Sequence, residues 1–389
     1  MIKRFWGRNV GVLGDFSVEL QPLTVLVGPN ASGKSTFLRA MRCLAMLTKI
    51  PAFHRQGSLR LGYRSTIADL ISIGQGQLTL GADVQQGGDV GSYEITVELI
   101  EGRPQIEAEK AFWKPVHGPS FSFEDGKPEF SYFDLNGKQL SSKFPRDASL
   151  PVLCGYLQRN DLRRREELRP LYRLVDAFAP FHVYRFSPAA IAKPAAIGEE
   201  LQHDGAGLAA ELDDLVGGDR AAFDQISRQL SDLFGHIKQL NLGTIRTPGG
   251  GIRDRGVLKG IVFEREGGTS VSAEMESDGV LLSLAHLVPS VKRNAPAFGI
   301  EEPETGTYPS LLKSRVDLFQ SIVKGTLGSK PVQVILTTHS PTLLTYVGDP
   351  TLVRIFDPKK DHVSIYEPPE TSMMDVINTR LSWSVGTAH

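Results

Sequence analysis

Residues 23–36 read LTVLVGPNASGKST, and this stretch decides the expected fold. Leu23 to Val27 is a short apolar run with β-branched residues, which predicts a buried strand. Gly28 and Gly33 then enclose four residues and are followed by a lysine and two hydroxyl residues. This pattern predicts a phosphate-binding loop between a strand and the N-terminus of a helix.

The residue types of this loop suit a bound polyphosphate. Inward-pointing backbone N–H groups bind the negative charge, and glycine leaves room for the phosphates to approach. We expect Lys34 to neutralise the β- and γ-phosphates and Ser35 to hold Mg²⁺. The expected nucleotide-binding residues of the loop are Gly28, Pro29, Asn30, Ala31, Ser32, Gly33, Lys34, Ser35 and Thr36.

The composition is that of an ordinary globular protein. The chain has 389 residues, 41% hydrophobic and 22% charged, with a formal net charge of −1. This charge excludes a strong overall attraction to nucleic acid, although local basic patches remain possible. Two cysteines, Cys43 and Cys154, predict neither a disulfide framework nor a zinc site. With no signal peptide and no apolar run of about 20 residues, we expect a cytoplasmic protein without membrane contact.

The spacing of apolar residues predicts the remaining elements. Five of them recur at helical spacing after the loop: Phe37, Ala40, Met41, Leu44 and Leu47. Alternation at Leu78–Val84 and at Tyr93–Leu99 predicts strands. Residues 207–241 are predicted to be helical, with buried positions that extend from Leu208 to Ile237, and residues 257–265 and 269–273 are predicted to form a hairpin.

Two apolar runs in the C-terminal third end in chemically useful residues. Residues 297–304 read AFGIEEPE, a strand followed by acids, which is the Walker B pattern. We expect Glu301 to lie near Mg²⁺ and Glu302 to act as the general base for the attacking water. Residues 332–341 read VQVILTTHSP, so His339 follows a second strand, at the edge where open α/β sheets bind ligands.

These motifs together resemble the RecF-like and SMC-like branch of the ABC-type ATPases, close to the ATPase part of the overcoming-lysogenization-defect (OLD) family. Members carry GPNxSGKST, SDG, EEPE or DEPE, and THSP in this order. The present chain has them at residues 28–36, 277–279, 301–304 and 338–341, and residues 203–208 resemble the family's DG-x-x-L segment. The resemblance covers nearly the whole chain.

The resemblance implies an α/β fold: an ABC-type P-loop ATPase head with a β-rich lobe, a helical lobe and no long coiled coil. The single head would span residues 1–389. Its expected parts are the N-terminal strands with the P-loop helix (1–48), a β-rich segment (49–150), a helical insert (151–245), and a core that carries the signature, Walker B and switch histidine (246–389).

The resemblance also implies roles for individual residues. Ser277 and Gly279 would belong to a signature helix that reaches the γ-phosphate on a second copy, so that two heads sandwich two ATP molecules. In the expected dimer-contact loop, 305–309, Tyr308 stands where histidine is common. Glu301 replaces aspartate. For the glutamine loop, the candidates Gln56, Gln75 and Gln77 are weak.

The function implied is a slow ATPase with ATP and Mg²⁺ as ligands. It would act as a dimerising switch, as a homodimer or a higher even oligomer, that controls a separate nuclease or toxin or acts on DNA. Antiphage defence and DNA repair are both open. Two alternatives remain: an ATP-bound scaffold that does not hydrolyse, and a nucleic-acid-binding module with a regulatory nucleotide site. The second alternative depends on the arginines of residues 159–173 and on Arg253 and Arg255.

Overall fold

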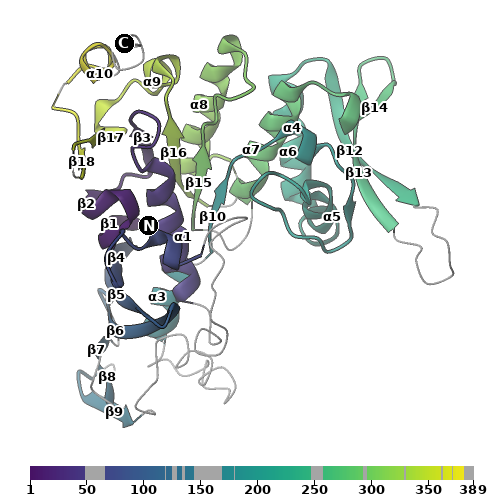
Figure 1. The fold of residues 1–389 in the computed structure, drawn as a ribbon. Helices are drawn as coiled ribbons and strands as arrows, with labels where there is room; N and C mark the ends of the chain where they lie inside the picture. The colour runs from purple at the N-terminus through teal and green to yellow at the C-terminus, as the bar shows by residue number, and fades with distance from the viewer. Residues whose placement is uncertain are drawn as a thin grey trace. The chain divides into compact units, whose positions relative to one another are not determined.

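The computed structural model divides the chain into two compact units (Figure 1). Unit 1 comprises Met1–Phe181 and Asp349–His389, and unit 2 comprises His182–Gly348. Both units combine helices with sheets, as the predicted α/β class requires. The described residues are 1–48, 66–118, 120–124, 129–133, 136–143, 169–178, 180–246, 257–291, 296–327, 330–360, 362–369 and 371–380.

An antiparallel sheet is the largest feature of unit 1. Among the described residues its eight strands run in the order β2-β1-β4-β5-β6-β7-β8-β9. They are β1 (Ile2–Val10), β2 (Gly14–Glu19), β4 (Gln77–Gln86), β5 (Asp89–Ile100), β6 (Arg103–Lys114), β7 (Phe121–Glu124), β8 (Glu129–Phe133) and β9 (Gln139–Lys143).

The predicted alternation is clear in β5, where Tyr93, Ile95 and Val97 are buried and the residues between them are half-buried. Strand β4 differs, because its alternate residue Gly81 is buried as well. A Cβ atom at Gly81 would lie 2.3 Å from the ring of Trp6. The Trp6 ring therefore covers the second face of β4, and glycine makes room for it.

Helix α1 (Lys34–Leu47) packs against this sheet, in contact with β1 and β4. Its predicted apolar stripe is confirmed, since all five residues are buried. Phe37 meets Phe5 and Phe356 edge-on, with ring centroids 5.2 and 5.7 Å apart. Helix α3 (Arg169–Phe178) contacts β5 and β6, and it contains Pro170 in its first turn. A helix accepts proline there, because the N–H that proline lacks would have no intrahelical partner in the first turn.

Unit 1 also carries a parallel strand pair that leads into the phosphate loop. Strand β3 (Leu23–Val27) is buried along its whole length and pairs in parallel with β17 (Val353–Pro358), while β18 (Val363–Tyr366) pairs antiparallel with β17. The shorter elements are η1 (Gly11–Leu13), η2 (Ala68–Leu70), η6 (Pro350–Leu352) and α10 (Met373–Arg380).

In unit 2, β15 (Ala297–Glu301) and β16 (Gln333–Thr338) are parallel neighbours, and β10 (Phe181–Tyr184) lies beside β15. Helix α8 packs on β16 and contacts α7 and α9. The helices are α4 (Pro188–Ile191), α5 (Leu208–Gly218), α6 (Arg220–Leu233), α7 (Asp278–Val291), α8 (Pro309–Lys324) and α9 (Pro341–Val347).

A second sheet in unit 2 is formed by β11 (Ala195–Ala196), β12 (Ile237–Arg246), β13 (Val257–Arg265) and β14 (Ser270–Ser272), with η5 (Ala273–Met275) after it. The predicted hairpin is confirmed by the antiparallel pairing of β13 with β14. The helical prediction for residues 234–241 was wrong. Helix α6 ends at Leu233, and Ile237 begins β12, opposite Arg265.

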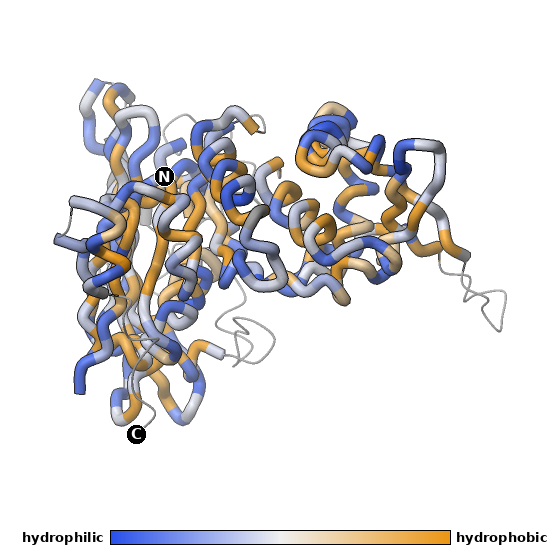
Figure 2. The backbone as a smooth tube through the Cα atoms, turned by 90° about the horizontal axis from the view of Figure 1, so that it is seen from above, coloured by the Kyte–Doolittle hydropathy of each residue, from blue (hydrophilic) through white to orange (hydrophobic). Residues whose placement is uncertain are grey.

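In the part of the chain that the structure describes, no helix is long and apolar enough to cross a bilayer. The longest described helix, α8, has 16 residues, so the described segments contain no long coiled coil. Hydropathy colouring of the chain shows hydrophobic stretches in the helices and strands of both units (Figure 2).

Candidate active site

The phosphate loop of unit 1 is a backbone cradle between β3 and α1. Gly33 ends it with φ +91°, and a Cβ atom there would lie 2.3 Å from Leu13 Cδ2. A Cβ atom at Gly28 would lie 2.4 Å from the carbonyl oxygen of Phe356. Both positions therefore require glycine, one for its left-handed backbone and both for close packing.

Lys34 lies over this loop. Its Nζ atom donates to the carbonyl oxygens of Gly28 and Pro29, at 2.8 and 2.9 Å, and it lies 3.4 Å from Ser32 Oγ. The lysine is 6% exposed, and Ser32 is fully buried. The ammonium group is thus held at the concave side of the loop, where the predicted phosphates would bind.

The remaining loop residues are more accessible. Asn30, Ala31 and Ser35 are exposed, and Thr36 is half-buried, with its Oγ1 accepting from Arg39 at 3.2 Å. Ala31 takes φ +60°, an uncommon backbone for a residue with a side chain. Ser35 thus presents its hydroxyl on the open side of the first turn of α1.

The predicted acids of unit 2 lie where strand β15 ends. Glu301 is its last residue, opposite Thr337 of β16, and both Glu301 and Glu302 are half-buried. Glu302 takes φ +48°. Its N–H donates to Thr337, to the carbonyl oxygen at 3.0 Å and to Oγ1 at 3.2 Å. These bonds hold a backbone conformation that glutamate rarely adopts, at a sharp turn out of the strand.

Three side chains meet at this end of the strands. Glu302 Oε2 accepts from Arg185 Nη2 at 2.8 Å, and Glu302 Oε1 lies 3.7 Å from His339 Nε2. Each is the first residue after a strand: Arg185 follows β10, Glu302 follows β15 and His339 follows β16. The structure therefore brings the predicted base and the predicted switch histidine together, and it adds Arg185. Sequence reasoning missed Arg185, although its place after a short apolar run was the same signal that singled out His339.

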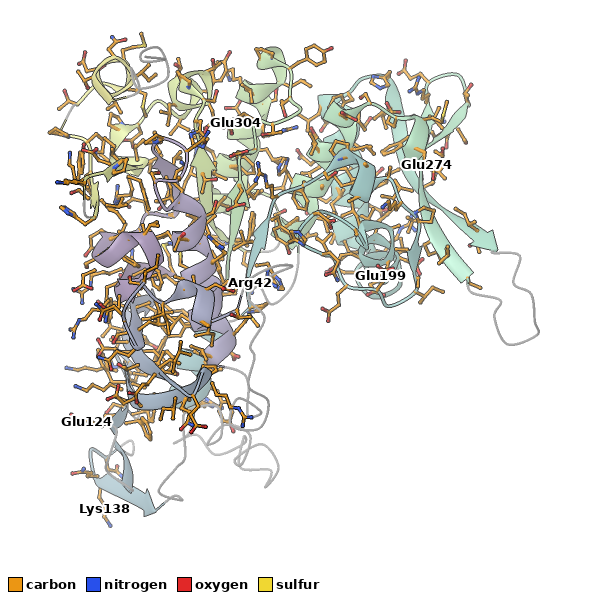
Figure 3. All side chains as sticks on the ribbon, in the orientation of Figure 1. Arg42, Glu124, Lys138, Glu199, Glu274 and Glu304 are labelled. Atoms are coloured by element: carbon orange, nitrogen blue, oxygen red, sulfur yellow. The ribbon has the colours of Figure 1, made fainter. Side chains whose placement is uncertain are left out.

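Glu304 holds the histidine segment in place. Its Oε1 accepts from Thr338 Oγ1 at 2.6 Å and from the His339 N–H at 3.1 Å (Figure 3 labels Glu304). Glu304 belongs to the predicted EEPE block but had no assigned role. It links the turn after β15 to the turn after β16, which fixes the backbone of His339.

Arg315 of α8 joins this turn to helix α7. Its guanidinium is 3% exposed and donates to Pro303 O at 2.6 Å, to Thr307 Oγ1, and to Ser283 Oγ at 3.3 Å. Burial lowers the pKa of Arg315 to about 10, an effect that the charge of Glu304 partly offsets. The hydroxyl of Ser283 donates in turn to Gly279 O at 2.8 Å.

The predicted signature residues lie at the start of α7. The Ser277 carbonyl accepts from the N–H groups of Val280 and Leu281, so Ser277 is the N-cap residue of this helix. Ser277 is exposed, and Gly279 is half-buried. Tyr308, in the predicted dimer-contact loop, has an exposed fraction of 77%.

The site residues thus form two groups, one in each unit. The loop residues gather around Lys34 in unit 1, and Glu302, His339 and Arg185 gather in unit 2. Gln75 and Gln77 are exposed in unit 1. Gln56, the arginines of residues 159–165, Arg253 and Arg255 lie outside the described residues.

Two family models match the chain in adjoining segments. Residues 7–169 match a model described as "AAA domain", and residues 156–345 match one described as "AAA domain, putative AbiEii toxin, Type IV TA system". The first segment contains the phosphate loop, and the second contains the Walker B acids and His339. A search of curated proteins gave no match.

Solved SMC heads resemble the chain over almost its whole length. A SmcHead bound to the C-winged helix domain of ScpA has a TM-score of 0.52 at 14% identity and covers 94% of this chain and 97% of that chain. The SMC head domain from Thermotoga maritima has a TM-score of 0.45 at 13% identity, and the match covers 95% of this chain and 99% of that chain. The Smc head domain from Pyrococcus furiosus, with an extended coiled coil and bound to the C-terminal domain of ScpA, has a TM-score of 0.47 at 14% identity. The match covers 97% of this chain and 98% of that chain.

The first of these structures shows that the fold is that of an SMC head. Together with the two matching AAA-domain models, this fold supports an SMC/RecF-like ABC-type P-loop ATPase. The predicted fold class is confirmed, the matches support the predicted ABC-type ATPase, and the closeness to the OLD family stays a prediction.

Proposed function

We propose that this chain is an ATP-driven conformational switch. ATP closes a dimer of two copies, hydrolysis opens it, and a separate partner protein reads the state. The observation that carries the proposal is the meeting of Glu302 and His339 at the end of parallel strands, in a chain whose Lys34 covers a phosphate loop. The ATPase family models support ATP as the nucleotide.

Each group of residues has a proposed role on one triphosphate. Lys34 neutralises the β- and γ-phosphates, Glu302 accepts the proton of the attacking water, and His339 contacts the γ-phosphate or that water. The proposed Mg²⁺ ligands are the exposed Ser35 hydroxyl and the half-buried Glu301 carboxylate, because P-loop sites hold the metal by one or two protein oxygens and the phosphates. When bound, the metal neutralises charge that develops on the phosphates.

The second half of each pocket is proposed to come from another copy, through Ser277 and Gly279. The exposed N-terminus of α7 supports this, since its N–H groups suit an anion. The exposed Tyr308 supports a contact between copies through the 305–309 loop. The scaffold alternative differs from this proposal in having no turnover.

ATP turnover of Glu302→Gln tests the proposal. Loss of the proton acceptor should lower kcat at least 100-fold, because general-base catalysis contributes about 10²–10⁴-fold. ATP binding should persist, and the variant should accumulate as a nucleotide-dependent dimer in size-exclusion chromatography with light scattering. The matched control is Glu274→Gln, an exposed glutamate of the same unit. Equal turnover in wild type and Glu302→Gln would refute the mechanism, and no turnover in wild type would favour the scaffold.

The proposed biological setting is the cytoplasm, in antiphage defence or DNA repair, with a nuclease or toxin as the separate effector. The description of the matching family model, which names a toxin of a Type IV TA system, supports defence. Co-expression with the neighbouring gene product tests this. The neighbour should co-purify with the wild-type protein in an ATP-dependent manner. With Glu302→Gln, which stays in the closed ATP-bound state, the amount that co-purifies should no longer depend on hydrolysis. A neighbour that neither binds nor changes its activity would contradict it.

A further inference from the structure

We propose that Arg185 is a positioning residue for ATP hydrolysis, holding the carboxylate of Glu302 in the orientation that turns one oxygen toward His339. This inference rests on the proposed role of Glu302 as general base. It assigns a role to a residue outside the motifs that identify the family, and it links residues 203–208 to the reaction.

The two carboxylate oxygens of Glu302 have different neighbours. Arg185 Nη2 donates to Oε2 at 2.8 Å, a normal length for a charge-assisted hydrogen bond. Oε1 lies 3.7 Å from His339 Nε2, beyond direct hydrogen-bond distance but close enough for both atoms to contact one water. The arginine therefore binds one carboxylate oxygen, and the other oxygen is the one nearer to the histidine.

The backbone of Glu302 is already fixed, so the side chain is the part that needs support. Two contacts with Thr337 hold the residue at φ +48°. A glutamate side chain has three rotatable bonds, and only 28% of its area is exposed here. The Arg185 contact selects one orientation of the carboxylate among those that this turn permits.

This ion pair is too exposed to serve mainly for stability. The side chain of Arg185 is 61% exposed, and solvent-exposed ion pairs of this kind contribute little to stability. Replacing Arg185 should therefore leave the protein folded. An effect on turnover would then come from the orientation of Glu302.

Arg185 is itself held between two anchored aromatic residues. Tyr184 is buried, and its ring lies 5.0 Å from that of Phe186 in a stacked arrangement. The Tyr184 ring also lies 6.4 Å from Phe298 of β15, the strand that ends one residue before Glu302. These ring contacts place the Arg185 backbone at a fixed distance from the strand that carries its partner.

Residues 203–208 supply the second support. The Arg185 N–H donates to His203 O and the Ser187 N–H donates to Asp204 O, each at 2.8 Å. The turn that presents these oxygens needs glycine: Gly207 has φ +82°, and a Cβ atom there would lie 2.4 Å from Glu200 O. The DG-x-x-L segment thus acts as a backbone brace for Arg185.

The test measures steady-state ATP turnover of Arg185→Ala, Arg185→Lys and Arg220→Ala. We expect Arg185→Ala to lower kcat about 10-fold with the KM for ATP unchanged, because misorientation of a catalytic group affects the reaction step. Arg185→Lys should recover most of the rate, since the observed contact is one N–H···O bond. Arg220, equally exposed and paired with Asp224 at 2.9 Å, is the matched control and should behave as wild type.

A double variant makes the test decisive. In the Glu302→Gln background, adding Arg185→Ala should cause no further loss, because the arginine acts through the carboxylate. A normal or raised kcat in Arg185→Ala, with Glu302→Gln inactive, would overturn this inference and leave the proposed function standing. A raised KM with normal kcat, or a further loss in the double variant, would also overturn it. An active Glu302→Gln would instead overturn the proposed function.

Discussion

Replacing Arg315 with methionine should destabilise unit 2 and loosen the segments that this residue joins. The guanidinium is almost fully buried and donates to Pro303, Thr307 and Ser283, which belong to the turn after β15, the predicted dimer-contact loop and helix α7. Methionine has a similar length and no donors. The variant therefore removes the hydrogen bonds and keeps most of the packing volume.

The size of the effect follows from two opposing contributions. Three hydrogen bonds from a charged donor contribute roughly 4.5–9 kcal/mol at about 1.5–3 kcal/mol each. Against this, burial lowers the pKa of Arg315 from 12.5 to about 10, so charge burial is unfavourable by about 3 kcal/mol, and methionine removes that penalty. The net loss should be about 1.5–6 kcal/mol, a range that includes the usual effect of removing one partner from a buried charged cluster.

Hydrogen exchange followed by mass spectrometry is the suitable assay, because Trp6 and Trp113 lie in unit 1 and their fluorescence would report on that unit. Peptides from residues 279–291 and 303–315 should exchange faster in Arg315→Met, and calorimetry should show a lower Tm. Arg220→Met, at an exposed site, is the control. Unchanged exchange and a loss below about 1 kcal/mol would refute the view that Arg315 joins these segments.

Two further predictions concern packing and pH. Gly28→Ala should abolish binding of an ATP analogue and lower stability by about 1–3 kcal/mol, because its Cβ would press on Phe356 O; normal binding by calorimetric titration would contradict this. His286 has a pKa well below 6.5, chiefly because it is buried. Below about pH 6.5 the unfolded chain therefore takes up a proton on His286 that the folded chain does not. The free energy of unfolding consequently decreases as the pH is lowered. Between pH 7.5 and 5.5, urea unfolding should show about 1 kcal/mol less loss for His286→Phe than for wild type; equal losses would contradict the assignment.

The phosphate loop could be predicted from sequence because its determinants are contiguous. Strand, glycines, lysine and helix follow one another within residues 23–47, and the contacts that shape the loop are mostly local, such as Lys34 to Gly28. The burial of β3 and of one face of α1 also follows from local spacing. The tight packing of Gly28 on Phe356 could not be predicted, since the two residues are far apart in sequence.

The helical prediction for Ile237 shows how spacing can mislead. Leu230, Leu233 and Ile237 follow helical intervals, but helix α6 ends at Leu233 and the next strand begins at Ile237. Gly235 in between was the available signal, because glycine commonly follows a helix C-terminus. Pairing with β13 then decides the conformation of Ile237, which is a tertiary effect that local propensity does not contain.

Arg185 and Arg315 escaped sequence reasoning for a common physical reason: each acts through atoms supplied by distant segments. Arg185 contacts a residue 117 positions away, and Arg315 donates to a hydroxyl 32 positions away. Through Ser283, which donates to Gly279 O, Arg315 connects the predicted signature helix to Pro303, directly beside Glu302. Because one buried guanidinium serves both segments, helix α7 cannot move relative to the Walker B turn without breaking a hydrogen bond inside the core. A contact between α7 and a second copy would therefore change the position of the proposed general base, through hydrogen bonds that lie within unit 2.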